Sequence, residues 1–414
     1  MESCSMLQRV WEQLEDAGMA ENTVITASEN QLELIKSQVK PKGIVLEAEA
    51  RDTFPAVMLS CAYLYSNMGA SMEDYAALLP VDPYTEAKYF EAVKQLEGVV
   101  KKTQAEVGLL GVVPTFPATK YGYILPKEEK KDYMEVKGFV EKPTEERAEE
   151  LLGQDALWNC GVFCVKIGDI LQRAVYYGVG TEYKEMFEQY QKLPKISFDY
   201  EVLQKAERLV AVKFEGFWKD LGTWDAMAEQ INTDTIGNVI LDETCMDTQV
   251  INELEIPVTV MGVKNMVVVA SKDGILVADK NEAARVKEVT ASIEYKAKFE
   301  ERRWGTLETL HESTDGGVST LTRKIKIYEG MNSSYHFHQE RDEIWTVLNG
   351  KGELILEGNK MLLGPGKAIC IRKNQRHAIK ALSDFEYIEM HVGTKVGNED
   401  INRITFHWDE IELV

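Results

Sequence analysis

Two histidines, one glutamate and a further histidine near the end of the chain are spaced as the ligands of a metal site would be. His336 and His338 are separated by one residue, Glu343 follows after a short turn, and His377 lies further on. Residues i and i+2 of a strand point to the same side, so the first two histidines can reach one ion. Imidazole and carboxylate ligands suit Zn, Fe, Mn, Ni or Co, and the residues do not choose among these metals. By itself the His-x-His pair is weak support, because a pair of surface histidines is the commoner arrangement.

Three basic residues, Arg372, Lys373 and Arg376, precede His377 in the segment IRKNQRH. They are a candidate binding site for a phosphate group close to the metal. The alternative is a solvated strand edge, and the residues leave both readings open.

The segments around these residues have β-type patterns. After Trp304 the chain reads as all-β, and Asn349-Gly350 predicts a hairpin turn between EIWTVL and GELILEG. Short β-rich runs also fill residues 237–290, followed by a charged helical connector expected at 282–303.

The first part of the chain alternates helix and strand patterns, which is typical of a sheet covered by helices on both faces. Strands are expected at 23–27 and 43–48, and ALLPVD (77–82) reads as a buried parallel strand that ends in Asp82. Ligands of open α/β sheets bind beyond the carboxyl ends of the strands, so Asp82 is well placed for chemistry. The structural alternative is that Asp-Pro is a common turn former.

Composition limits the classes of partner. A length of 414 residues suggests two or three domains, and the net charge of -21 argues against nucleic acid or an anionic membrane as the main partner. The six cysteines show no CxxC pair, which favours a reduced compartment. No leader pattern and no apolar stretch approaching ~20 residues is found. We therefore expect a cytoplasmic protein.

The segment from Gly330 to Gly350 resembles the first motif of the cupin barrels, G-x5-H-x-H-x4-E-x6-G, over its whole length. Pro365, Gly366 and His377 fit the second motif, whereas the asparagine often found four residues after the histidine is Ala381 here. Together with the basic segment, the barrel resembles the cupin half of type II mannose-6-phosphate isomerases. In that chemistry a metal polarises the sugar carbonyl and hydroxyl while a base moves a proton between neighbouring carbons.

Seven segments of the first three hundred residues resemble mannose-1-phosphate guanylyltransferases, in the order and near the spacing of that family. They are RDTFPA (51–56), LLPVDPY (78–84), PTFPATKYGYI (114–124), FVEKP (139–143), WNCGVF (158–163), SFDYEVLQKAE (197–207) and FWKDLGTWDAM (217–227). With the cupin, this is the bifunctional type II arrangement over nearly the whole chain.

The resemblance implies GTP and mannose 1-phosphate as substrates, GDP-mannose as product and Mg²⁺ as cofactor. It assigns Asp82 and Asp220 as carboxylates for Mg²⁺, whose preferred ligands are oxygens. It gives Lys142 contact with the sugar phosphate and Glu141 hydrogen bonds to sugar hydroxyls. The backbone of Gly122 and the side chain of Asn159 would line the sugar pocket. The structural alternative for the Glu141-Lys142 pair is an exposed charged pair before a proline.

One family feature does not occur in this sequence. The glycine-rich loop GGxGTRLWPLSR and the PKQF segment, whose backbone N–H groups and basic side chains hold the triphosphate, are not found. Met1 would fall just after that loop, so we expect an N-terminally truncated domain that lacks the first central strand and is impaired in GMP transfer. A mis-set start, a truncated gene and a degenerate paralogue remain open.

The predicted fold is α/β. A Rossmann-like nucleotidyltransferase domain (1–235, N-terminally incomplete) precedes a β-rich segment with a helical connector (236–300) and an all-β cupin barrel (301–414). The expected function is mannose-1-phosphate guanylyltransferase for polysaccharide biosynthesis, in a homo-oligomer. The alternatives are a metal-dependent isomerase of mannose 6-phosphate through the cupin alone, and a non-catalytic regulator that binds a sugar nucleotide.

Overall fold

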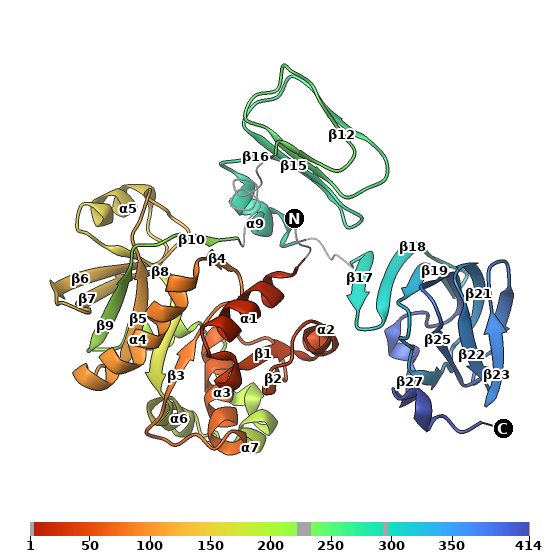
Figure 1. Cartoon of the computed structure of the whole chain (residues 1–414), viewed down its shortest axis with the longest axis horizontal. Coiled ribbons are helices and arrows are strands. Elements are labelled where there is room, and N and C mark those ends of the chain that lie inside the picture. Colours follow the sequence, from red (N-terminus) through yellow and green to blue (C-terminus); the bar gives the residue numbers. More distant parts are fainter. Residues whose placement is uncertain (1–3, 222–232, 293–296, 414) are drawn as a thin grey trace. The chain divides into compact units, whose positions relative to one another are not determined.

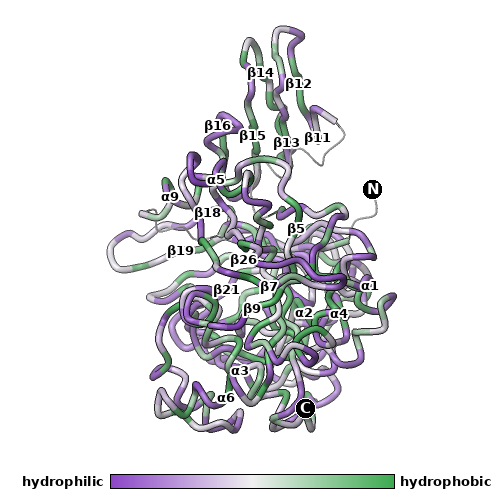
Figure 2. Tube along the Cα trace, turned by 90° about the vertical axis from the view of Figure 1, so that its left-hand side faces the viewer, coloured by the Kyte–Doolittle hydropathy of each residue, from purple (hydrophilic) through white to green (hydrophobic). Residues whose placement is uncertain are grey.

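The computed structural model describes residues 4–221, 233–292 and 297–413. The chain forms two compact units, Met1–Met227 and Ala228–Val414 (Figure 1). Figure 2 shows hydrophobic and hydrophilic stretches intermixed along the chain, and in the described residues no helix combines the length and the apolar character needed to span a membrane.

A six-stranded sheet forms the centre of the first unit. Its order is β3 (Tyr75–Leu78), β8 (Leu157–Lys166), β5 (Val107–Val112), β9 (Leu209–Phe214), β7 (Met134–Val140) and β6 (Tyr123–Glu129). β5 and β9 pair in parallel, and every residue of β5 is buried. A strand buried on both faces reads as the continuous apolar run VGLLGV.

Helices cover both faces of this sheet. They are α1 (Met6–Asp16), α2 (Leu32–Gln38), α3 (Thr53–Asn67), α4 (Ala87–Thr103), α5 (Glu145–Leu152), α6 (Ile167–Tyr176) and α7 (Tyr183–Glu188). Leu109 and Leu110, neighbours in β5, belong to two different apolar clusters because side chains alternate along a strand. The predicted helix-covered sheet is confirmed.

The capping of α1 explains where that helix begins. The hydroxyl of Ser5 accepts from Gln8 N at 3.1 Å, and the side chain of Gln8 accepts from Ser5 N at 2.9 Å. This capping box satisfies two N–H groups at the helix end. Val10, Trp11 and Leu14 then bury the apolar face of α1.

Two strands lie apart from the six-stranded sheet. β1 (Val24–Ser28) pairs in parallel with β2 (Gly43–Glu47), which confirms the two strands expected there. The prediction of a parallel strand over 77–82 was wrong, because β3 ends at Leu78 and pairs antiparallel with β8. Pro80 follows and has no N–H for a ladder. Among the described strands, β1 pairs only with β2 and β3 only with β8, and the expected absence of a first strand stays a prediction.

We predict a large stability loss for Phe54→Ala, near the start of α3. Phe54 is fully buried and meets Tyr177 edge-on, with 6.0 Å between ring centroids. Emptying this site should lower the free energy of unfolding by about 3–5 kcal/mol, measured by urea denaturation. Phe187→Ala, at a 39% exposed ring, is the control, and equal losses for both variants would contradict the prediction.

A β-rich segment begins the second unit. Its strands are β11 (Thr235–Ile236), β12 (Val239–Leu241), β13 (Gln249–Asn252), β14 (Val258–Val260), β15 (Met266–Ala270) and β16 (Ile275–Asp279). β15 and β16 form an antiparallel hairpin, whereas β12 and β14 pair in parallel. The helix predicted over 282–303 was wrong in extent. Only α9 (Val286–Thr290) and a short 3-10 turn are helical among its described residues, and β17 (Phe299–Arg302) is a strand.

Two facing sheets form the C-terminal barrel. One has the order β17, β18 (Gly305–Asp315), β19 (Val318–Ile327), β26 (Phe385–Gly393), β21 (Arg341–Asn349) and β24 (Ala368–Ile371). The other has the order β23 (Asn359–Leu363), β22 (Gly352–Leu356), β25 (His377–Ala381), β20 (Tyr335–Phe337) and β27 (Asn402–Thr405). Inward side chains of both sheets, including Trp345, Ile379 and Phe385, share one apolar cluster. The predicted all-β barrel is confirmed.

The hairpin predicted at Asn349-Gly350 was wrong. β21 pairs with β24 and β26, whereas β22 pairs with β23 and β25, so this dipeptide connects two different sheets. Gly350 does take the left-handed conformation that favours glycine, with a φ of 78°. The turn was predicted at the right residues, but the two strands on either side of it do not pair with each other.

Candidate functional site

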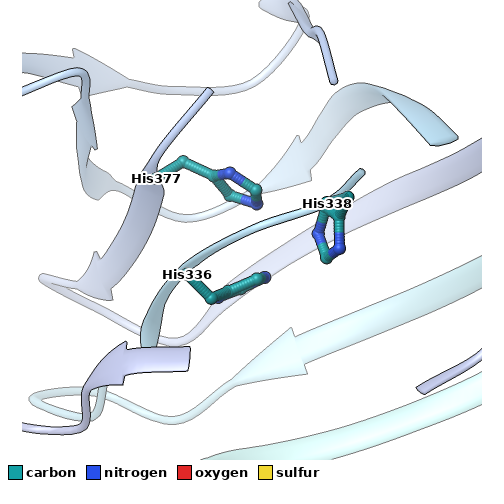
Figure 3. A group of neighbouring side chains, drawn as sticks. All are labelled: His336, His338 and His377. Atoms are coloured by element: carbon teal, nitrogen blue, oxygen red, sulfur yellow. The ribbon is translucent and has the colours of Figure 1, made fainter. Parts of the chain in front are cut away.

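Three histidines converge inside the C-terminal barrel. Figure 3 shows the rings of His336, His338 and His377 turned toward one another, and one ring nitrogen of each lies within 4.8 Å of the others. His336 is directly opposite His377 in the pairing of β20 with β25. His338 and His377 are buried, and His336 is half-buried. The i, i+2 spacing therefore places two histidines on one side, and strand pairing supplies the third.

Backbone carbonyls fix the orientation of these rings. Each Nδ1 lies at hydrogen-bond distance from one carbonyl oxygen, that of Ser334 for His336 (2.7 Å), Asp400 for His338 (2.9 Å) and Gln375 for His377 (3.0 Å). A neutral ring that donates from Nδ1 leaves the Nε2 lone pair for a metal. The buried Nε2 of His377 has no hydrogen-bond partner. Such a donor set fits a divalent transition metal.

Glu343 lies beside the histidines. Its Oε1 is 2.8 Å from Nε2 of His338, and its Oε2 is 3.4 Å from Nε2 of His377. The buried guanidinium of Arg341 donates to the same carboxylate at 3.1 Å from Nε. Burial alone would raise the pKa of Glu343, but the neighbouring histidines hold this pKa well below its usual range. The carboxylate is therefore ionised, as a metal ligand must be.

The sequence interpretation missed two further buried groups, Glu389 and His391. Nε2 of His391 is 2.9 Å from Oε2 of Glu389 and 3.2 Å from Oε1 of Glu343. Burial alone would lower the pKa of His391, but the charge of Glu389 raises it. The signal was present, because Glu-x-His in a strand puts both side chains on one face.

The structure does not bring Arg372 to the histidines. Its guanidinium donates to Asp342 Oδ2 at 2.9 Å, and Asp342, next to Glu343 in β21, points to the opposite side of the strand. Lys373 N also donates to Asp342, and Arg376 precedes the inward His377 by one residue. The phosphate-binding site expected at these three residues stays a prediction.

Strand pairing brings the two residues predicted to bind magnesium, Asp82 and Asp220, close together in the first unit. β4 (Pro83–Thr85) pairs antiparallel with β10 (Trp218–Asp220), and Asp220 is directly opposite Pro83. Leu221 N donates to the carbonyl of Asp82 at 3.3 Å. Asp82 is exposed and Asp220 half-buried. Two segments far apart in the sequence thus bring the backbones of Asp82 and Asp220 close together, and their role as magnesium ligands stays a prediction.

Gly122, Glu141 and Asn159 also meet. Asn159 N donates to the carbonyl of Gly122 at 2.8 Å. A Cβ at Gly122 would lie 2.6 Å from Oε2 of Glu141, so a larger residue here would displace the carboxylate of Glu141. Lys142 adopts the left-handed conformation (φ 44°), and its Nζ is 3.5 Å from Oε1 of Glu141. Non-glycine residues in this conformation concentrate at functional sites.

Asp199 joins this group, although the sequence interpretation gave it no role. Its Oδ1 accepts from Nδ2 of Asn159 at 3.0 Å. Burial raises the pKa of Asp199, and burial together with the charge of Asp199 raises the pKa of Glu141. Raised carboxyl pKa values at one place are typical of functional sites.

Glu141→Gln is expected to stabilise the first unit at neutral pH. A carboxyl whose pKa is raised on folding contributes stability below its ordinary pKa, and that contribution is lost as pH rises through the folded value. The variant should therefore melt higher than the natural protein at pH 7.5 and equally at pH 4. Glu91→Gln, at an exposed position of α4, is the control. A variant that is less stable at both pH values would contradict the argument.

Comparison with known proteins matches a family to each end of the chain. Residues 1–236 match the nucleotidyl transferase family, and residues 291–406 match the mannose-6-phosphate isomerase C-terminal family. A putative mannose-1-phosphate guanylyltransferase of Vibrio cholerae is 28% identical, over 96% of this chain and 91% of that protein. The mannose-1-phosphate guanylyltransferase of Escherichia coli is 26% identical, over 94% and 89%.

A solved structure, described as mannose-1-phosphate geranyltransferase from Thermus thermophilus, is 28% identical. It has a TM-score of 0.60 and covers 71% of this chain and 90% of its own. The family model matches more than half of the chain, through the unit that carries Asp82 and Asp220. The chain belongs to the nucleotidyl transferase family.

Proposed function

We propose that the chain is a mannose-1-phosphate guanylyltransferase, which transfers GMP from GTP to mannose 1-phosphate. A phosphate oxygen of mannose 1-phosphate bonds to the α-phosphorus of GTP, the bond from that phosphorus to the bridging oxygen breaks, and pyrophosphate leaves. The products are GDP-mannose and pyrophosphate. The juxtaposition of Asp82 and Asp220 through β4 and β10 carries this proposal.

The residues of the first unit fit the parts of this reaction. Asp82 and Asp220 offer the oxygen ligands that Mg²⁺ prefers, and the ion would neutralise charge on the α-phosphate and the leaving pyrophosphate. Glu141 accepts hydrogen bonds from sugar hydroxyls, and Asn159 lines the sugar pocket. Lys142, with a 65% exposed side chain, reaches the sugar phosphate. The expected cytoplasmic location and homo-oligomeric assembly belong to the same proposal.

A coupled assay tests the proposal directly. The chain is incubated with GTP, mannose 1-phosphate and Mg²⁺, and GDP-mannose and pyrophosphate are measured in parallel. Equal amounts of both products are expected, and their formation should stop when EDTA removes the ion. Formation of neither product by the folded protein, with any nucleoside triphosphate and hexose 1-phosphate supplied, would reject it.

The barrel supports a second function, metal-dependent interconversion of mannose 6-phosphate and fructose 6-phosphate. The observation that favours it is the buried convergence of His336, His338 and His377. A divalent ion held there would polarise the sugar carbonyl and hydroxyl. His391, whose Nε2 lies 3.2 Å from Oε1 of Glu343, is a buried group that can hold a proton at that position. Isomerisation that requires added Zn, Fe, Mn, Ni or Co and stops with a chelator is expected, and no activity with any of these metals would reject this second function.

A further inference from the structure

Asp199 holds one of the residues expected to line the sugar pocket. Nδ2 of Asn159 donates to Asp199, and Oδ1 of Asn159 accepts from Gly161 N at 3.1 Å. Both ends of this amide are therefore oriented by the protein. The amide keeps one further N–H, which can donate to a ligand oxygen.

A second contact anchors the segment that carries Asp199. Phe198 N donates to the hydroxyl of Thr53 at 2.8 Å, and Thr53 N donates to Oδ1 of Asp52 at 2.7 Å. Asp52 has a φ of 70°, so this turn is held in a conformation that costs energy for a residue other than glycine. Asp199 then begins a short π-helix, Asp199–Leu203. Single π-turns occur often at functional sites.

The charged groups around Asn159 indicate which chemical groups a ligand of this site would carry. Glu141 and Asp199 are both partly desolvated carboxylates, and the charge of Asp199 adds to burial in raising the pKa of Glu141. The ammonium of Lys142 is the nearby cation. A ligand that places two hydroxyl donors between the carboxylates would satisfy both, and an anionic group on the same ligand would meet Lys142. A hexose 1-phosphate has both features.

We propose that Asp199 is a specificity-determining residue of the sugar site. Its carboxylate, together with that of Glu141, accepts the hydrogen bonds of two neighbouring hydroxyls of the hexosyl phosphate, while it also holds the amide of Asn159. This inference rests on the proposed transferase function, and it adds the recognition of a vicinal diol to the roles of Glu141, Lys142 and Asn159.

Binding of mannose 1-phosphate and its 2-, 3- and 4-deoxy analogues, measured by titration calorimetry, tests the inference. Asp199→Asn should weaken binding of mannose 1-phosphate by about 10- to 100-fold, as expected for a lost hydrogen bond to a charged group. Two neighbouring deoxy positions should weaken binding to the natural protein and have little further effect in the variant. Additive losses for every analogue, or an unchanged affinity of the variant, would overturn it.

Two further variants separate recognition from folding. Glu201→Gln changes a buried carboxylate of the same π-helix that bonds to Tyr177 and Lys205 instead, and it should leave the affinity for mannose 1-phosphate unchanged. Asn159→Ala should also flatten the differences among the deoxy analogues, which keeps the test open if Asp199→Asn does not fold. Full discrimination among the analogues by Asn159→Ala would count against the inference.

Failure of the inference and failure of the proposed function give different results. If the natural protein binds mannose 1-phosphate and Asp199→Asn binds it equally well, the inference fails and the proposed substrate stands. If another hexose 1-phosphate binds instead, the proposed sugar is wrong, and the same comparison with that sugar decides the role of Asp199. Binding of no hexose phosphate would overturn both.

Discussion

Asp220→Asn is expected to lower the rate of GMP transfer by at least about 10³-fold. Asp220 lies opposite Pro83, directly beside Asp82, and an amide in its place removes one negative oxygen ligand from the pair. Charge stabilisation by a bound ion contributes several kcal/mol to such a transition state, and about 4 kcal/mol corresponds to 10³-fold. Initial rates of pyrophosphate release at saturating GTP and mannose 1-phosphate measure the effect.

The dependence on Mg²⁺ concentration separates loss of a ligand from general damage. Asp220→Asn should need far more Mg²⁺ for half-maximal rate, whereas a distorted site would lose rate at every concentration. Glu215→Gln provides the control, because this exposed carboxylate pairs with Lys213 near the same strand and should leave the rate and the Mg²⁺ dependence unchanged. A variant at Asp220 with the natural rate and Mg²⁺ dependence would exclude a role in holding the ion.

The parts of the fold that could be predicted are those with strong local signals. The strands at Val24–Ser28 and Gly43–Glu47 and the all-β character after Trp304 follow from apolar patterns in the sequence. Pairing partners are not local. Asn349-Gly350 has the composition of a hairpin turn, yet sheet pairing separates the strands on either side of it. Residues 299–302 likewise have the charged pattern of a helix, yet Phe299–Arg302 is a strand that pairs with β18.

The same distinction applies to the sites. His336 and His338 could be grouped from their spacing, and their meeting with His377 was expected from the resemblance. The places of Arg372 and His391 depend on which face of a strand each residue occupies. Alternation from the inward Glu343 puts Asp342, and with it the guanidinium of Arg372, on the outer side. Alternation in β26 puts Glu389 and His391 inside, beside Glu343.

Asp199 could not be recognised from spacing, because its role depends on contacts across the fold. It lies next to Asn159 only because the π-helix Asp199–Leu203 packs against the start of β8, and the resemblance had marked its segment without giving it a function. Raised pKa values for Glu141 and Asp199 are likewise consequences of burial. Desolvation arises only when the chain folds, so the spacing of residues in the sequence does not reveal it.

His338→Ala is expected to remove the metal from the barrel. The ring is 2% exposed, its Nδ1 lies 2.9 Å from the carbonyl of Asp400, and its Nε2 lies 2.8 Å from Glu343. Loss of even an outer hydrogen-bond partner of a ligand lowers metal affinity about 10- to 100-fold, so loss of the ligand itself should cost more than about 100-fold. Metal content after dialysis, measured by mass spectrometry, should fall from about one ion per chain to near zero, and isomerisation of mannose 6-phosphate should be lost.

His311→Ala is the matched control, because His311 is an exposed histidine of β18 in the same barrel. It should keep both the metal and the activity, and the melting temperature should confirm that His338→Ala still folds around the cluster of Trp345, Ile379 and Phe385. Retained metal in a folded His338→Ala protein would show that His336 and His377 suffice to hold the ion. Because the barrel core does not include His338, loss of metal with an intact core would locate the defect in the ligand set. GMP transfer in the same variant should be unchanged, since Asp82, Asp220 and the sugar pocket belong to the other unit.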